Sequence, residues 1–357
     1  MRPRLKDVFW ERYGAELGLV FDAREQVRLD DPDGAVELLL DLMRKGSRTP
    51  PELADVVGVP LHAVDRIIAE LDAHRLLVDD DRAGRIGTDA SERYADNLAF
   101  FDRYATLAVG REDMQERVHA AHVLVLGLGG VNTTVVGHLC GFGVDRLTLV
   151  DAGTIGVRDL ARQQLARWRD VGTRTARRAA VWVRDIDPSM QVDAVDVGVG
   201  DAAAFGAVLD RFCPDIVVAD VDGTVDVDLW VNAACVARNV PFIRAATKQT
   251  TATVYSVDPG RSACVACAAG TSVGQSPDVL RLLRERPAAG LGMGPVSGML
   301  ASLAALEILR YVTGYEPPAY AGQPMRIEFG AGTDMRRLAW RRDTACGTCA
   351  PAQRRSA

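Results

Sequence analysis

Two pairs of cysteines have the spacing that most clearly indicates chemistry. Cys264 and Cys267 form one CxxC sequence, and Cys346 and Cys349 form another. Four thiolates bind Zn²⁺ tetrahedrally and leave no position for water, so the pattern predicts a structural zinc site that joins two distant segments. Redox chemistry is the alternative, but we expect neither pair at the start of a thioredoxin-type helix.

The three other cysteines stand singly. Cys140, Cys213 and Cys235 occur in apolar helix or strand contexts. Free cysteine is commonly buried, so we expect all three in the core and none as a covalent catalyst.

A glycine-rich turn is the second chemical signal. The sequence HVLVLGLGGVN predicts a buried strand, a turn with Gly127, Gly129 and Gly130, and a helix from about Val131. Glycines let the backbone approach a ligand closely, and a helix N-terminus offers free N–H groups to an anion. Asp151, at the end of the next predicted strand, is placed for a ribose hydroxyl pair. A dinucleotide dehydrogenase, or a tight turn without a ligand, would fit this turn as well.

The elements around this turn alternate between strand and helix. From His122 onward, short β-branched runs are separated by helical stretches: HVLVLG, DRLTLVD, VDAVDV, DIVVADV and VPFIRAA. This alternation predicts an α/β fold with a Rossmann-like, mostly parallel sheet and helices on both faces. We assign this domain to residues 119–357 and a linker with lead-in helices to residues 89–118.

The N-terminal residues 1–88 have a different pattern. Residues 35–86 read as three helices followed by a wing, with the polar turn DDDRAG at its tip and a strand or two before the first helix. Residues 1–86 carry 13 Lys and Arg against 18 Asp and Glu, a net charge of −5. Since DNA binding needs a cationic surface, this winged helix is expected to dock a peptide or to be structural.

The composition agrees with a globular protein without nucleic-acid or membrane partners. The net charge is −6, and 48% of the residues are apolar. The N-terminus lacks the apolar core of a signal peptide, and the apolar stretch 297–312 contains Glu307 and Arg310 and is too short to span a membrane. We therefore expect a cytoplasmic location, where thiols stay reduced.

These motifs together resemble the ThiF/MoeB/HesA superfamily, which is related to the ubiquitin-activating enzymes, and within it the microcin-type enzymes that adenylate a peptide. The resemblance spans about residues 91–350. It is carried by the glycine turn, its acid and the split CxxC pairs, and also by ERYADNLAFF, LARQQL, DVDG, LWVNAACVARNVPFIRAA and GMGPVSGMLASLAALEILRYVTG.

The resemblance implies an adenylyltransferase that uses ATP and Mg²⁺, in which a substrate carboxylate attacks the α-phosphate and pyrophosphate leaves. Gly127, Gly129 and Gly130 would line the nucleotide, and Asp151 would hold its ribose. Arg162 would reach the phosphates and Asp222 would bind the metal. The resemblance also implies a homodimer.

Three positions depart from the family pattern around the polyphosphate. Asp96 replaces an arginine, Asp159 an asparagine and Thr175 a lysine. These changes remove two cations and add two anions. Nearby cations that could compensate, unless they form only a solvated surface, are Arg158, Arg174, Arg177, Arg178 and Lys248.

Two functions remain open at this point. The first is an adenylyltransferase that activates a peptide or small-protein carboxylate in the biosynthesis of a modified peptide. The second is a catalytically silent relative whose winged helix binds a leader peptide for a partner enzyme of the cyclodehydratase type. A nicotinamide or flavin oxidoreductase is less favoured, because the cysteines and LARQ would have no role in it.

Overall fold

The computed structural model describes residues 1–22, 25–82, 84–221, 225–248, 250–270, 292–330 and 332–350. Contacts divide the chain into two compact units, Met1–Arg117 and Val118–Ala357. The segment predicted as a linker lies almost entirely in the first unit. It forms the helices α4 (Thr88–Arg93), α5 (Ala95–Asp102) and α6 (Arg111–Ala120).

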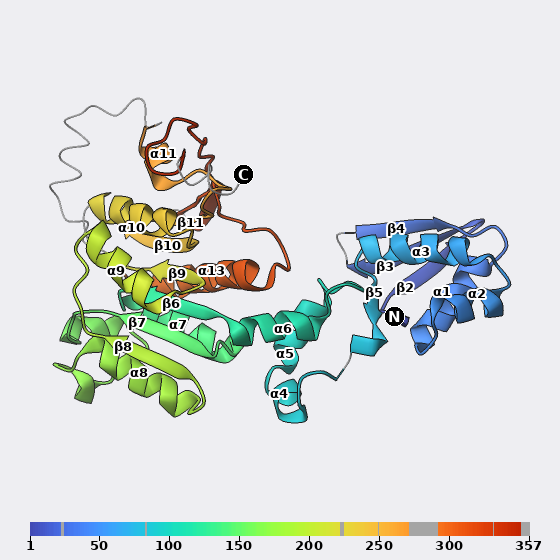
Figure 1. Ribbon diagram of the computed structural model, residues 1–357, viewed down its shortest axis with the longest axis horizontal. Helices are drawn as coiled ribbons and strands as arrows, with labels where there is room; N and C mark the ends of the chain where they lie inside the picture. Colours follow the sequence, from blue (N-terminus) through green and yellow to red (C-terminus); the bar gives the residue numbers. More distant parts are fainter. Residues whose placement is uncertain are drawn as a thin grey trace. The chain divides into compact units, whose positions relative to one another are not determined.

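The second unit is built on one eight-stranded sheet (Figure 1). Its order is β13-β12-β11-β10-β9-β6-β7-β8, and the pairs from β10 to β8 are parallel. The prediction of a mostly parallel α/β sheet is confirmed. The strand bounds are β6 (His122–Leu126), β7 (Arg146–Val150), β8 (Gln191–Val195), β9 (Ile216–Ala219), β10 (Phe242–Lys248), β11 (Thr251–Val257), β12 (Met325–Glu328) and β13 (Asp334–Arg337).

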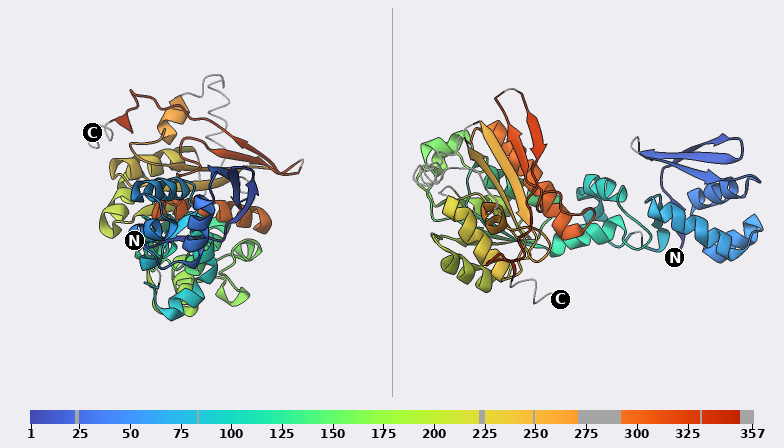
Figure 2. Two further views of the ribbon diagram at one scale, coloured as in Figure 1. Left: turned by 90° about the vertical axis from the view of Figure 1, so that its right-hand side faces the viewer. Right: turned by 90° about the horizontal axis from the view of Figure 1, so that it is seen from above.

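The sequence pattern did not predict the last three strands. β11, β12 and β13 pair antiparallel in succession and extend the sheet beyond β10. Figure 2 shows these orange and red strands side by side at the sheet edge. All four residues of β13 are exposed, so hydrophobic periodicity could not mark it.

Helices pack on both faces of this sheet (Figure 1). On one face α9 and α10 pack against each other, and their apolar residues form a cluster with β9, β10 and β11. On the other face α7 packs against α13. The helix bounds are α7 (Gly130–Phe142), α8 (Thr175–Ile186), α9 (Ala202–Phe212), α10 (Val225–Ala237), α11 (Val265–Gly270) and α13 (Gly294–Thr313).

Helix α13 is the one helix in the described part of the chain that is long and apolar enough to cross a membrane. Half of its most apolar window is buried within the structure. It also contains Glu307, which is 0% exposed and accepts hydrogen bonds from the Ser256 hydroxyl at 2.7 Å and the Tyr320 amide at 2.9 Å. A buried, hydrogen-bonded carboxylate is typical of a packed core helix.

The first unit contains the three predicted helices, α1 (Ala35–Lys45), α2 (Pro50–Val57) and α3 (Leu61–Ala73). Thr49 and Glu52 form a capping box that starts α2. The helices pack on a three-stranded antiparallel sheet in the order β2-β3-β4, with bounds β2 (Phe9–Tyr13), β3 (Glu16–Asp22) and β4 (Glu25–Asp30).

The predicted wing after α3 differs from the structure. β5 (Leu77–Asp79) follows α3, but it pairs with β1 (Pro3–Leu5) from the N-terminus, and Asp80–Arg82 form a 3-10 helix. Within residues 84–93 the structure has no strand that returns along β5. The polar turn therefore ends a two-stranded sheet whose other strand is distant in sequence, which local pattern could not reveal.

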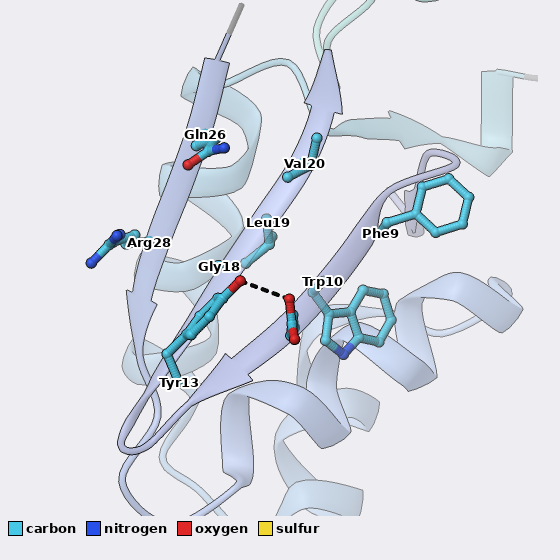
Figure 3. A pocket seen from close by; sticks show the side chains of 9 residues that line it. Phe9, Trp10, Tyr13, Gly18, Leu19, Val20, Gln26 and Arg28 are labelled. Carbon is cyan, nitrogen blue, oxygen red and sulfur yellow. Dashed lines mark hydrogen bonds between the residues drawn. The ribbon is translucent and has the colours of Figure 1, made fainter. Parts of the chain in front are cut away.

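The outward face of β2-β3-β4 carries a pocket of about 390 Å³ (Figure 3). Phe9 is 71% exposed and Tyr13 58% exposed, while the Tyr13 ring covers Gly18 and its hydroxyl donates to Glu11 at 2.7 Å. Neighbouring side chains alternate across the sheet, so the buried Leu17 and Leu29 face the helices instead.

Asn132 stands where many dinucleotide-binding turns have a third glycine, and its buried side chain holds the sheet together there. Its amide nitrogen Nδ2 donates to the carbonyl groups of Leu126 at 3.1 Å, Gly127 at 2.8 Å and Val218 at 3.3 Å. It therefore joins α7 to both β6 and β9, in an environment where a lost partner leaves carbonyl groups unsatisfied.

We predict that Asn132→Ala lowers the free energy of unfolding by about 1–3 kcal/mol, because buried carbonyl groups lose their donor. Urea unfolding followed by circular dichroism would measure it. Gln191→Ala, which removes an exposed amide from β8, is the matched control and should change stability by less than about 0.5 kcal/mol. Equal effects of the two substitutions would contradict this role of Asn132.

Candidate functional site

The glycine turn lies where the strand order of the sheet reverses. β6 is flanked by β7 on one side and by β9 on the other, so the crossovers leave a crevice at the carboxyl ends of β6 and β9. Ligands of open α/β sheets bind at this type of position. Gly127 has φ +77°, and a Cβ there would overlap the carbonyl oxygen of Asp220. Glycine is thus required for the turn to pass the end of β9.

Asp220, directly after β9, is a site residue that the sequence analysis missed. Its Oδ2 accepts from the backbone N–H groups of Val131 at 3.2 Å and Asn132 at 3.5 Å, at the N-terminus of α7. A Cβ on Gly129 would lie 2.5 Å from the same oxygen. The position is an anion site by geometry, since these amides have no acceptor within the helix. Its sequence signal was an acid directly following a buried strand.

Asp151 lies at the end of β7, as predicted. Its carboxylate accepts from Leu128 N at 2.7 Å and Gly153 N at 2.6 Å, which holds it beside the glycine turn. The Thr175 hydroxyl group also lies beside Gly153, because it is 3.7 Å from the position that a Cβ on this glycine would take. Each carboxylate oxygen keeps further lone pairs for a ligand hydroxyl group.

Arg162 and Gly130 come together at the same turn. A Cβ on Gly130 would lie 3.1 Å from the Cβ of Arg162 and 2.7 Å from the hydroxyl of Ser297, in the first turns of α13. The N-termini of α7 and α13 therefore meet beside Arg162. Helix N-termini carry partial positive charge, so this corner supplies positive potential in addition to the arginine. Ser297 carried no signal of its own in the sequence, because it lies within the apolar stretch 297–312.

Of the three positions that depart from the family pattern, Asp159 has specific partners beside the turn. Asp159 Oδ1 lies 3.2 Å from Arg162 Nη2, and its Oδ2 accepts from Gly156 N at 2.9 Å. Asp159 therefore partly neutralises the predicted phosphate-binding arginine. Asp96 is exposed on α5 in the first unit, and Thr175 is buried at the start of α8.

The candidate compensating arginines mostly form ion pairs of their own. Arg178 lies 3.0 Å from the buried Asp170, and Arg177 pairs with Asp196. Arg174 donates to the Ala152 carbonyl at 2.6 Å. Arg158 is exposed. Asp222, predicted to bind the metal, lies outside the described residues, as does the side chain of Lys248.

The four cysteines of the two CxxC pairs form one buried cluster. Their Sγ atoms all lie within 4.8 Å of one another, and the nearest distances are 3.8 Å for Cys264–Cys267 and Cys264–Cys346 and 3.5 Å for Cys267–Cys349. Tetrahedral thiolates around zinc stand about 3.8 Å apart, from a metal–sulfur distance of about 2.3 Å. The cluster therefore has the size of a four-thiolate metal site.

The thiols of this cluster differ in proton affinity. Burial raises the pKa of Cys346, but hydrogen bonds from the backbone of Cys349 and Thr348 and from the thiols of Cys267 and Cys349 together lower it more, and the result is about 7. Burial raises the pKa of Cys264 and of Cys349. A bound cation would favour the thiolate form at all these positions.

Two cysteine predictions need correction. Cys140 and Cys235 are buried, but Cys213 is exposed. Cys213 follows Phe212, the last residue of α9, and has φ +46°, so it lies outside the helix whose apolar residues are packed. Cys264 also directly precedes α11, so one pair does stand at a helix start. However, this CxxC pair lies against the other CxxC pair, and a cluster of four thiols favours metal binding over redox chemistry.

The fold and the site define a class of protein: a Rossmann-type α/β protein with an anion-accepting glycine turn at its switch point and a four-cysteine cluster. The model of the ThiF family matches residues 101–348. The chain therefore belongs to the ThiF family.

Individual relatives agree with this assignment. The chain is 29% identical over 238 residues to the sulfur carrier protein ThiS adenylyltransferase of Escherichia coli, covering 66% of this chain and 89% of that protein. It is 30% identical over 252 residues to the vegetative HesA protein of Trichormus variabilis, covering 67% and 84%.

Solved structures show the same fold over nearly the whole chain. The crystal structure of E. coli MccB has a TM-score of 0.78 at 19% identity and covers 98% of this chain and 97% of its own. MccB with ATP has a TM-score of 0.75 at 19% identity and covers 98% and 100%. MccB was also solved with MccA, at a TM-score of 0.73, 20% identity and the same coverage.

We predict that two glycine substitutions at the turn separate folding from ligand binding. Gly127→Ala should destabilise the protein by more than about 1 kcal/mol, because the left-handed backbone disfavours a side chain and the overlap is with backbone. Gly129→Ala should leave the fold intact, since its clash is with the rotatable Asp220 carboxylate, but should displace that carboxylate.

Thermal unfolding would measure the loss of stability in Gly127→Ala, and ATP–Mg²⁺ calorimetry would measure the change in nucleotide binding in Gly129→Ala. Gly141→Ala, in α7 with no atom near its added Cβ, is the control for both. If Gly129→Ala bound nucleotide like the unaltered protein, the turn would not be the nucleotide site.

Proposed function

We propose that this protein is an ATP-dependent adenylyltransferase that activates the carboxylate of a peptide or small protein, in the biosynthesis of a modified peptide. The observation that carries the proposal is the set of glycine turn, Asp151 and Arg162 at the switch point of a ThiF-family fold. The relatives named as adenylyltransferases support it.

In the proposed reaction, the glycine turn and the N-terminus of α7 lie along the ATP phosphates, and Asp151 accepts hydrogen bonds from the ribose hydroxyl groups. A substrate carboxylate oxygen attacks the α-phosphorus. The new bond is C–O–P, the bond to the bridging oxygen of the β-phosphate breaks, and pyrophosphate leaves with the electron pair. The products are an acyl adenylate and pyrophosphate. Arg162 and the two helix N-termini stabilise the charge on the phosphate oxygens.

The residues also fit a magnesium ion. Mg²⁺ is held in such sites by one or two carboxylates together with substrate phosphates. The Asp220 carboxylate lies at the N-terminus of α7, where the phosphates would bind. Because the carboxylate and the phosphates repel each other, a cation between the two is needed for both to be there. When bound, the ion neutralises charge on the leaving pyrophosphate. We assign its coordination to Asp220, with Asp222 as the second carboxylate predicted from the sequence.

The four-cysteine cluster is proposed to hold a structural zinc ion. Its sulfur spacing suits a tetrahedral site, and all four residues are buried. The ion would fix α11 to the C-terminal segment, which joins two parts of the second unit that are far apart in sequence.

The first unit is proposed to recognise the peptide. We interpret its three helices and small sheets as a domain related to winged helices that docks a leader peptide, which its acidic sequence favours over DNA. The MccB structure with the peptide MccA supports a peptide substrate. The proposal includes a homodimer in the cytoplasm.

A catalytically silent peptide-binding protein is the second candidate, and specific contacts favour it. Asp159 pairs with Arg162, and Asp220 takes the amides that a phosphate would use. In such a protein these carboxylates would be permanent substitutes for the nucleotide. Calorimetry distinguishes the two functions, because micromolar binding of ATP–Mg²⁺ contradicts the silent protein.

We predict pyrophosphate release when the protein is incubated with ATP, Mg²⁺ and peptides that have a free C-terminal carboxylate. The same peptides with an amidated C-terminus are the matched control, since they lack the attacking oxygen. Release with neither form, for any peptide of a precursor library encoded near this gene, would count against the enzyme.

We predict one zinc ion per chain, measured by elemental analysis of protein purified without chelators. Cys346→Ser should lose most of this zinc and lower the melting temperature, because metal binding contributes to folding. Cys213→Ser, at an exposed cysteine outside the cluster, should keep the full zinc content. Disulfides in place of zinc would overturn the assignment.

A further inference from the structure

One buried cation lies close to the proposed nucleotide site and has no role in it so far. Arg244 is in the middle of β10, beside Ala219 of β9 in the parallel register and opposite Tyr255 of β11. It is only 6% exposed. An arginine is rarely this buried unless it is paired, so its contacts indicate what it does.

The guanidinium of Arg244 holds the backbone on both sides of Asp220. Nη2 donates to the Val221 carbonyl at 2.9 Å, and Nη1 donates to the Ala219 carbonyl at 3.4 Å. Asp220 itself is bonded through its amide to the Leu126 carbonyl at 2.9 Å. The peptide group before Asp220 and the carbonyl group of Val221 are therefore held, and these contacts restrain the backbone that carries the Asp220 side chain.

Arg244 also compensates negative charge. Its Nε bonds to the carboxylate of Asp228, in the first turn of α10. Burial lowers the pKa of Arg244, but the charge of Asp228, the hydrogen bond to it, and the charges of Tyr255 and Asp220 together raise it more, so the net shift is upward. The charge of this one buried arginine thus offsets the negative charge of two carboxylates, Asp228 and Asp220.

We propose that Arg244 is a positioning residue that aims the Asp220 carboxylate at the amides of α7 and so sets the affinity for the metal nucleotide. It acts through the 219–221 backbone and touches no substrate. The effect on affinity for the metal nucleotide rests on the proposed function. The placement of Asp220 does not, because it holds for the protein without nucleotide.

Arg244→Lys is the decisive substitution, because lysine keeps the charge but lacks the planar fork that reaches two carbonyl groups. We expect hydrogen exchange at the peptide containing Val131 and Asn132 to become faster, since these amides lose a fixed acceptor. We expect ATP–Mg²⁺ affinity by calorimetry to fall about tenfold, and raised Mg²⁺ to restore much of it. Restoration by Mg²⁺ would not occur for a general loss of structure.

Arg238→Met is the matched control. It removes another arginine–aspartate pair, with Asp210 at 2.7 Å, at the opposite end of α10. It should change neither measurement. Arg244→Met, which also removes the positive charge beside Asp228 and Asp220, should weaken nucleotide binding more than Arg244→Lys.

Three results would overturn the inference. The first is wild-type exchange at Val131 and Asn132 in Arg244→Lys, and the second is faster exchange spread over the whole chain. The third is an ATP–Mg²⁺ affinity that Arg244→Lys leaves unchanged. If the unaltered protein bound no ATP–Mg²⁺ but the exchange result held, the proposed function would fail and the placement of Asp220 would stand.

Discussion

The contact of the Asp220 carboxylate with the first amides of α7 is the interaction on which the site depends. It forms because β6 and β9 end side by side where the sheet order reverses, which brings a helix N-terminus to the end of β9. Gly127 and Gly129 make the approach possible, and Asn132 ties the same helix to both strands. Without glycine at these positions, backbone and carboxylate could not come this close.

In the proposed function, the same contact shows how an acidic site would accept a polyphosphate. The sequence shows fewer cations than the family pattern, and the structure pairs Arg177 and Arg178 with their own carboxylates. What remains is a corner with Arg162 and the N-termini of α7 and α13. Partial charges of aligned peptide dipoles are fixed in place, so they need no side chain to stabilise an anion.

Buried charged groups behind the site also form hydrogen bonds that fix its geometry. Arg244 and Asp228 neutralise each other, and the fork of the arginine is used on backbone carbonyl groups rather than on solvent. Glu307 in α13 is likewise buried and fully hydrogen-bonded. Such groups add less to net stability than to a single defined geometry, which is what a site needs when its anion must point at two amides.

The sequence by itself determined the parallel α/β domain, the three N-terminal helices, the glycine turn and the pairing of two CxxC motifs, because each has a local period or spacing. Only the tertiary structure decided that β5 pairs with β1, that Cys213 is exposed, that Asp220 meets the first amides of α7 and that Arg244 holds the backbone beside Asp220. These depend on contacts between segments far apart in the chain. Local pattern carries no information on which distant strand ends become neighbours.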